Sequence, residues 1–278
     1  MPPKAASPRR RIRRAAAGAL LMLAAPAMAQ ERTPSHCVAL AQGPERVMRA
    51  AWTDPLPAET LRLHYVGHAT FLLQTPGGLA LATDYTGHLG PAPLIPDVVT
   101  MNNAHSTHWT PAPDPAIAHV LRGWREDGGP AEHHLDLGEI LVRNVPTTTR
   151  DAMGGARDFG NSIFVFEAAG LCIGHLGHLH HEPTAEQYAM LGRLDVVMAP
   201  VDGGLTLDRP AMIRVLKRLR SSIVLPMHWF GEATLAAFLD GMAGEFEIRR
   251  PGTSEVAVAL ATLPARPTII VLEPERLR

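Results

Sequence analysis

The chain has 278 residues, of which 46% are hydrophobic and 19% are charged, and its formal net charge is -1. These values are typical of a globular protein that buries one large core or two small ones, and they exclude a disordered chain. The near-neutral balance excludes a folded surface rich in Lys and Arg, so we expect no nucleic-acid partner.

The N-terminal segment has the pattern of an export signal. An arginine-rich stretch at residues 9–14 precedes an apolar run at residues 15–25, and Ala-Met-Ala at 27–29 matches a cleavage site. We predict a signal peptide over residues 1–29 and a periplasmic or secreted mature protein. The apolar run is shorter than the roughly 20 residues that cross a bilayer as a helix, so we expect no stable membrane anchor after cleavage. The arginines fit either a twin-arginine signal or an ordinary basic leader.

Residues 30–57 are predicted to form an N-terminal arm with one helix at 43–52, followed by the main domain at 58–278. Cys37 in this arm and Cys172 in the domain are the only two cysteines. A disulfide between them and a buried free thiol at Cys172 both remain open from the sequence. Neither cysteine has the CxxC spacing of a metal knuckle or a redox pair.

Short apolar runs separated by Gly and Pro predict strands in the first half of the domain. These strands are expected at residues 61–66, 69–74, 79–84, 98–101, 139–145 and 162–167. In the second half, strands at 171–175, 195–201 and 222–227 alternate with helices at 184–191, 209–220 and 232–242. Thr184 and Gln187 give the first of these helices a capping pattern. Apolar strands with helices between them predict an α/β fold in which helices cover sheets.

Histidines follow three of the predicted strands. His105 and His108 follow the strand at 98–101, four histidines lie within residues 175–181, and His228 follows the strand at 222–227. One sheet-based fold could bring these imidazoles together around a metal ion. In an extended segment, His178 and His180 would share one side. Each segment alone also fits solvated or packing histidines without a metal.

These segments and the hairpin sequence Tyr-Val-Gly-His-Ala-Thr at 65–70 together resemble the metallo-β-lactamase superfamily, in particular its ascorbate-phosphate lactonase-like and phospholipase D-like branch. Further matches are Leu-Ala-Thr-Asp at 81–84, His-Leu-Gly at 175–177, the run at 195–204, and Pro-Met-His at 226–228. The resemblance covers about residues 61–273. It implies a four-layered αβ/βα sandwich.

The sequence departs from the family's metal motif H-x-H-x-D-H. If the motif ends at His108, its first histidine falls on Asn103 and its aspartate on Thr107. The family's next ligand, a histidine after Val-Pro, falls on the threonines at 147–149.

The retained histidines suggest a site rebuilt for one metal. His178 stands where the family has a bridging aspartate, and the final ligand is kept as His228. The resemblance therefore implies His105, His108, His178 and His228 as ligands. Four neutral donors suit one Zn²⁺, or another divalent transition metal, and disfavour a second close cation.

We therefore expect an exported zinc-dependent hydrolase of ester, lactone or phosphodiester bonds in a small-molecule substrate, using a metal-bound water. Asp84 and His68 are the predicted catalytic residues, with Asp202, His180 and His181 as further candidates for proton transfer or support.

The alternative is a non-catalytic metal- or ligand-binding protein that keeps the fold, because four protein ligands could close the coordination sphere. Specificity is expected in loops at 109–124 and 147–159, and the sequence names no substrate.

Overall fold

The computed structural model describes residue 37, residues 52–150 and residues 153–278. The predicted signal peptide at 1–29 and almost all of the predicted helix at 43–52 lie outside the described residues. Within the described ranges, no helix combines the length and the apolar character needed to cross a membrane.

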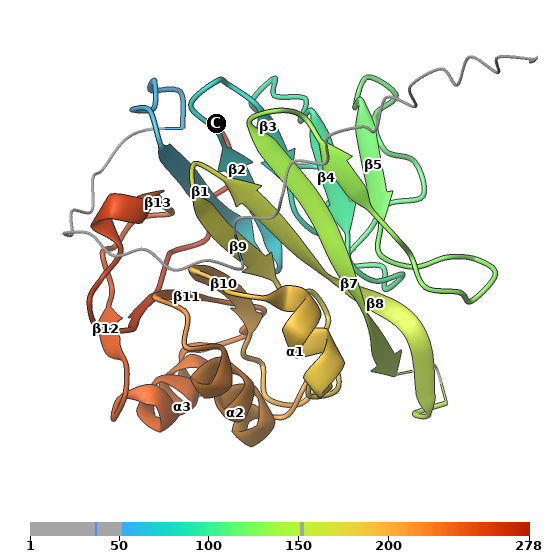
Figure 1. Cartoon of the computed structure of the whole chain (residues 1–278), viewed down its shortest axis with the longest axis vertical. Coiled ribbons are helices and arrows are strands. Elements are labelled where there is room, and N and C mark those ends of the chain that lie inside the picture. The colour runs from blue at the N-terminus through green and yellow to red at the C-terminus, as the bar shows by residue number, and fades with distance from the viewer. Residues whose placement is uncertain (1–36, 38–51, 151–152) are drawn as a thin grey trace, which may run out of the picture. The chain divides into compact units, whose positions relative to one another are not determined.

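Two sheets form the centre of the domain (Figure 1). The first has six strands in the order β13-β1-β2-β3-β4-β5. Its strands are β1 (Thr60–Gly67), β2 (Thr70–Gln74), β3 (Ala80–Ala82), β4 (Val98–Met101), β5 (His119–Arg122) and β13 (Glu255–Ala259). The β1–β2 hairpin is antiparallel, whereas β3, β4 and β5 run parallel. The ends of β3 and β4 therefore meet at one edge of this sheet.

The second sheet has eight strands in the order β12-β14-β11-β10-β9-β8-β7-β6. They are β6 (His134–Asp136), β7 (Ile140–Arg150), β8 (Ala156–Ala168), β9 (Leu171–His175), β10 (Val196–Pro200), β11 (Ile223–Met227), β12 (Glu247–Arg249) and β14 (Thr268–Ile270). Strands β9, β10 and β11 are parallel neighbours. Each is a run of fully buried residues, as expected for strands covered on both faces.

The core lies between the two sheets. Leu63 of β1 and Phe71 of β2 belong to the same buried cluster as Phe164 of β8 and Met198 of β10. Each such side chain contributes about 1.5–3 kcal/mol when it is removed from water. The two sheets are therefore held face to face by apolar burial.

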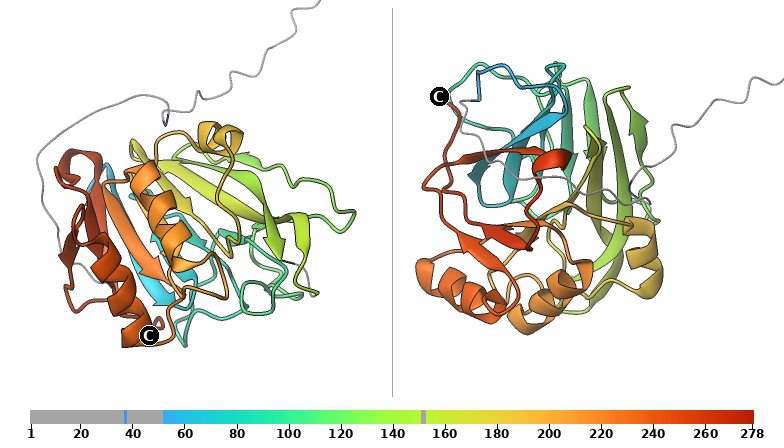
Figure 2. Two further views of the ribbon diagram at one scale, coloured as in Figure 1. Left: turned by 90° about the horizontal axis from the view of Figure 1, so that it is seen from below. Right: turned by 60° about the vertical axis from the view of Figure 1, so that its left-hand side comes forward.

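Three helices cover the outer face of the second sheet (Figure 2). They are α1 (Ala185–Leu191), α2 (Arg209–Leu219) and α3 (Glu232–Met242), and a short 3-10 helix, η2 (Leu260–Thr262), follows β13. The outer face of the first sheet packs against loop residues such as Leu89, Ile117 and Leu277. The α/β class of the predicted four-layered αβ/βα sandwich is confirmed, with two packed sheets, but among the described residues loops rather than helices cover the outer face of the first sheet.

The longer apolar runs were predicted correctly, and the three described helices lie where the sequence places them. The predicted loop at 147–159 is wrong for most of its length, because β7 extends to Arg150 and β8 begins at Ala156. Gly160 allows this close pairing, since a Cβ there would lie 2.3 Å from the Thr149 side chain. Strand β5 likewise interrupts the predicted loop at 109–124.

Of the two alternatives for Cys172, a disulfide or a free thiol, the structure has the disulfide. It joins Cys37 and Cys172, whose Cα atoms are 5.7 Å apart. Cys172 lies on β9 and is fully buried. The Cys37 carbonyl also accepts a hydrogen bond from the Arg193 amide at 2.9 Å. Cys37 is thereby fixed to the second sheet.

Candidate metal centre

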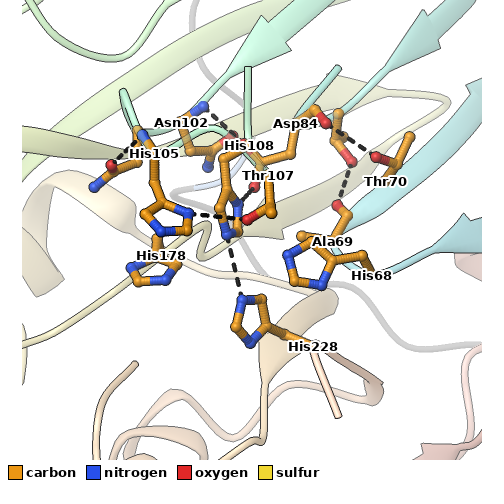
Figure 3. Close-up of polar contacts among 12 residues, drawn as sticks. His68, Ala69, Thr70, Asp84, Asn102, His105, Thr107, His108, His178 and His228 are labelled. Atoms are coloured by element: carbon orange, nitrogen blue, oxygen red, sulfur yellow. Dashed lines mark hydrogen bonds and ion pairs between the residues drawn. The ribbon is translucent and has the colours of Figure 1, made fainter. Parts of the chain in front are cut away.

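Five histidines gather where strands of both sheets end (Figure 3). His68 lies between β1 and β2, His105 and His108 follow β4, His178 follows β9, and His228 follows β11. Neighbouring ring centroids are 4.2 Å apart for His68 and His228, and 4.6 Å apart for His108 and His178. The ends of parallel strands are a common position for ligand sites, because the loops there can turn side chains toward one another.

His108 is held by a buried carboxylate. Its Nδ1 lies 2.6 Å from Oδ2 of Asp84, and both side chains are completely buried. Burial raises the pKa of Asp84 to about 6 against the opposing influence of His175 and the Asn102 amide. At neutral pH the carboxylate is therefore ionised and accepts from His108 Nδ1–H. The free lone pair of His108 is then on Nε2.

His228 also lies beside a carboxylate, because Oδ2 of Asp202 is 3.4 Å from His228 Nδ1, although this contact lacks hydrogen-bond geometry. Three backbone amides, of Gly204, Leu205 and Thr206, donate to this carboxylate, as does the Thr206 hydroxyl. Burial would raise the pKa of Asp202, but the His228 ring and the Thr206 donors outweigh it and hold that pKa below its usual range. Asp202 is therefore anionic at neutral pH.

The Nε2 atoms of His108 and His228 face each other at 3.3 Å (Figure 3). Because Asp84 holds Nδ1 of His108, the Nε2 atom of His108 carries a lone pair, which can accept a hydrogen bond from His228 Nε2–H or share a metal ion with His228. In a tetrahedral zinc site, with Zn–N bonds of about 2.0–2.1 Å, two ligand nitrogens lie about 3.3–3.4 Å apart. The residues present therefore fit a zinc ion. Carboxylate–histidine–metal arrangements of this kind fix the ring tautomer.

The ring nitrogens form two overlapping groups among the described residues. One consists of His68, His108 and His228, and the other of His105, His108 and His178, with ligand atoms within 4.8 Å of one another in each. The four predicted ligands are thus divided between the two groups: His105 and His178 lie in one, His228 lies in the other, and only His108 belongs to both. Since its Nδ1 is occupied by Asp84, His108 can serve one metal at a time through Nε2.

His68, His108 and His178 are neutral at pH 7, which is the form that binds metals. Burial is the main cause, and it lowers the pKa of His68 to about 3, and those of His108 and His178 to about 2, with neighbouring histidines adding to the effect. Burial and then Arg150 lower the pKa of His180 to about 4. Nδ1 of His178 and Nε2 of His180 are 3.0 Å apart, so one ring donates a hydrogen bond to the other.

Comparison with known proteins gives the family. A sequence profile described as beta-lactamase superfamily domain matches residues 62–228. The chain belongs to this superfamily. A UPF0173 metal-dependent hydrolase of Methanoculleus marisnigri is 27% identical over 214 residues, which cover 72% of this chain and 93% of the relative.

Two solved structures of the same fold are also similar. One is a proposed Zn-dependent hydrolase of the metallo-β-lactamase superfamily from Thermotoga maritima, with a TM-score of 0.54 and 23% identity over 77% of this chain and 98% of that chain. The other is a metallohydrolase from Ignicoccus hospitalis, with a TM-score of 0.52 and 18% identity over 78% of this chain and 97% of that chain. The suggested membership of the superfamily is confirmed.

Two superfamily ligand positions that are changed in this chain are filled by hydrogen-bonded polar groups. Asn103 Nδ2 donates to Thr149 Oγ1 at 2.9 Å, and Asn103 Oδ1 accepts from the His105 amide at 2.9 Å. Next to them, Asn161 Nδ2 donates to Thr147 Oγ1 and Asn161 Oδ1 accepts from the His178 amide. These side chains satisfy one another where superfamily ligands would stand, which disfavours a second metal there.

The other residues singled out from the sequence lie behind, beside or outside the two histidine groups. Asp84 lies behind His108, and its second oxygen accepts from the Asn102 amide at 2.7 Å, so it positions His108 rather than contacting a substrate. His175 lies at hydrogen-bonding distance, 2.7 Å, from the Ala69 carbonyl, outside both histidine groups. His181 is exposed. His68, which the sequence predicts as a catalytic residue, lies in the group with His108 and His228, where its ring could also serve as a ligand.

A separate cavity of about 1020 Å³ lies beside β7 and α1, with Arg143, Phe159 and Met190 in its lining. None of the five clustered histidines lines it. It is therefore distinct from the candidate metal centre.

Proposed function

We propose that this protein is an exported, metal-dependent hydrolase that holds one Zn²⁺ at His108 and His228 and cleaves an ester, lactone or phosphodiester bond. The observation that carries the proposal is the 3.3 Å separation of the two Nε2 atoms, each ring being backed by a carboxylate. His105, His178 and His68 are the remaining ligand candidates of the cluster.

The ion would supply a Lewis acid for polarising the scissile bond and activating water. Asp84 and Asp202 hold the His108 and His228 rings with Nε2 toward a common point. Phe230 is 63% exposed, and its ring lies edge-on to His228 at 5.1 Å, so it provides an apolar wall at the site. His178 and His180 share one hydrogen-bonded proton between Nδ1 and Nε2.

The relatives support the hydrolase assignment, because four curated relatives are named metal-dependent hydrolases. Imidazole donors suit zinc, and zinc dependence has been proposed for the similar structure from Thermotoga maritima. The Cys37–Cys172 disulfide supports export, because disulfides persist mainly in oxidising compartments.

The rival function is a closed, non-catalytic metal site in the same fold. Exposure at one side of the cluster favours hydrolysis over this alternative, since His105 is exposed and His68 is half-buried. A small molecule could therefore approach the ligand atoms from solvent. A structural zinc site would instead be closed by protein on all sides.

The test is metal analysis of the mature protein together with a panel of ester, lactone and phosphodiester substrates. We expect about one zinc per chain and hydrolysis of at least one substrate class. His228→Ala should lose both, whereas His134→Ala, which changes an exposed histidine on β6, should keep both. A wild-type protein without bound metal, or equal metal content and activity in His228→Ala, would contradict the proposal.

A further inference from the structure

We propose that His68, which lies outside the H-x-H-x-D-H motif, is the third ligand of the metal. The metal then sits among His68, His108 and His228, and His105 and His178 remain uncoordinated. This inference rests on the proposed function and specifies the ligand set of that site.

The first argument is the unsatisfied nitrogen of His68. Its Nε2 is buried and has no hydrogen-bond partner among the described residues. The His68 ring lies 4.2 Å from the His228 ring and 5.0 Å from the His108 ring, measured between centroids. A buried ring nitrogen without a partner is costly, and a metal ion among these three rings would remove that cost.

The second argument is the backbone link between His68 and His228. The His68 carbonyl accepts a hydrogen bond from the His228 amide at 2.7 Å and another from the Tyr65 hydroxyl at 2.9 Å. The β1–β2 turn of the first sheet is therefore attached to the end of β11 in the second sheet. This link fixes the backbones of His68 and His228 relative to each other, from which their imidazoles extend.

The third argument is the distribution of backbone strain. His68, Asp84 and His228 have positive φ values of 56°, 41° and 56°, a region that non-glycine residues rarely adopt. Of the seven described non-glycine residues with positive φ, these three belong to the His68–His108–His228 group or support it, and neither His105 nor His178 is among the seven. Strained conformations persist where the surrounding structure enforces them, and they are concentrated at functional sites.

The fourth argument is charge. The carboxylates of Asp84 and Asp202 stand directly behind His108 and His228, so two negative charges face a dication held there. In the other group, the Nδ1 partner of His178 is the ring of His180 at 3.0 Å rather than a carboxylate. Coulombic attraction therefore favours the position beside His68 for a dication.

This ligand set bears on catalysis. Thr107 stands where the superfamily motif has an aspartate ligand, and its hydroxyl lies 2.9 Å from Nδ1 of His105. His68 supplies a neutral donor in its place. Three protein ligands leave the fourth position of a tetrahedron open, which is the arrangement of catalytic rather than structural zinc sites.

The test compares His68→Asn with His105→Ala and His178→Ala in the mature protein. Asparagine tolerates a positive φ and lacks the imidazole, so this variant removes the donor with little effect on the turn. Zinc affinity is measured by chelator competition, and ligand geometry by the visible absorption of the Co²⁺-loaded protein. We expect His68→Asn to lose zinc affinity by at least about 100-fold and to change the Co²⁺ spectrum. His105→Ala and His178→Ala should stay within about threefold of wild type.

The outcomes separate this inference from the proposed function. Zinc loss in His105→Ala or His178→Ala, or unchanged binding in His68→Asn, would overturn the assignment of His68 and leave a one-zinc hydrolase intact. Failure of the wild-type protein to bind zinc would overturn both. Thermal unfolding of each metal-free variant shows whether its fold is preserved.

Discussion

At the residue scale, a carboxylate that binds one ring nitrogen of a histidine determines which nitrogen is left to bind a metal. Asp84 accepts two hydrogen bonds in the interior, from His108 Nδ1–H at 2.6 Å and from the Asn102 amide at 2.7 Å. Both donors need an oxygen, and a carboxylate provides two. The charge and the second oxygen of Asp84 are therefore both used.

Asp84→Asn should weaken zinc binding by about 10–100-fold, because an amide carries no charge and has only one oxygen for the two donors. Chelator competition measures the affinity. The matched control is Asp127→Asn, which changes a carboxylate that is 59% exposed and paired with Arg125. Equal zinc affinities in Asp84→Asn and wild type would show that Asp84 does not support the metal site.

The sequence predicted which histidines lie close together but not how they form two separate ligand groups. His105, His108, His178 and His228 follow apolar strands, and the folded chain brings all four into one cluster. The division into two groups depends on the distances between ligand atoms, and His68 is held beside His228 by the hydrogen bond from the His228 amide to the His68 carbonyl. Such contacts join segments far apart in the chain, so no local pattern contains them.

At the element scale, burial decides which strands can be recognised from the sequence. Strands β4, β9, β10 and β11 are fully buried apolar runs, and the sequence predicts all four. Strand β6 has only three residues, two of them exposed, and β12 is similarly short and exposed. Their pairing with neighbouring strands stabilises them, and that information lies outside their own residues.

Helix α1 offers a local test at this scale, because the predicted capping box is present. The Thr184 side chain accepts from the Gln187 amide, and the Gln187 side chain accepts from the Thr184 amide. Thr184→Ala should lower the free energy of unfolding by about 0.5–2 kcal/mol, measured by urea denaturation. Thr184→Ser keeps the hydroxyl and should retain most of the stability. If both variants lose the same amount, the cap contributes nothing.

At the scale of the whole molecule, the candidate metal centre takes its residues from both sheets. His68, His108 and Asp84 come from the first sheet, whereas His228 and Asp202 come from the second. Because the sheets are already packed through a shared apolar core, the site is held by the fold rather than by one loop. Metal binding should therefore add stability to an already folded domain.

The disulfide is the other long-range constraint, since Cys37 and Cys172 are 135 residues apart in the sequence. Closing so long a loop restricts the unfolded chain strongly, and removal of a native disulfide typically costs about 2–5 kcal/mol. Cys37→Ala combined with Cys172→Ala should lower the free energy of unfolding by that amount in urea denaturation of the metal-free protein. Alanine suits both sites because both side chains are buried.

A reducing agent provides the control for this double variant. Reduction should destabilise the wild-type protein to a similar extent and leave the variant unchanged, because only the wild type has a bond to lose. Zinc affinity of the folded variant should stay within about threefold of wild type, because neither cysteine belongs to the ligand groups of the site. Equal urea midpoints for wild type and variant under oxidising conditions would mean that this bridge does not constrain the unfolded chain.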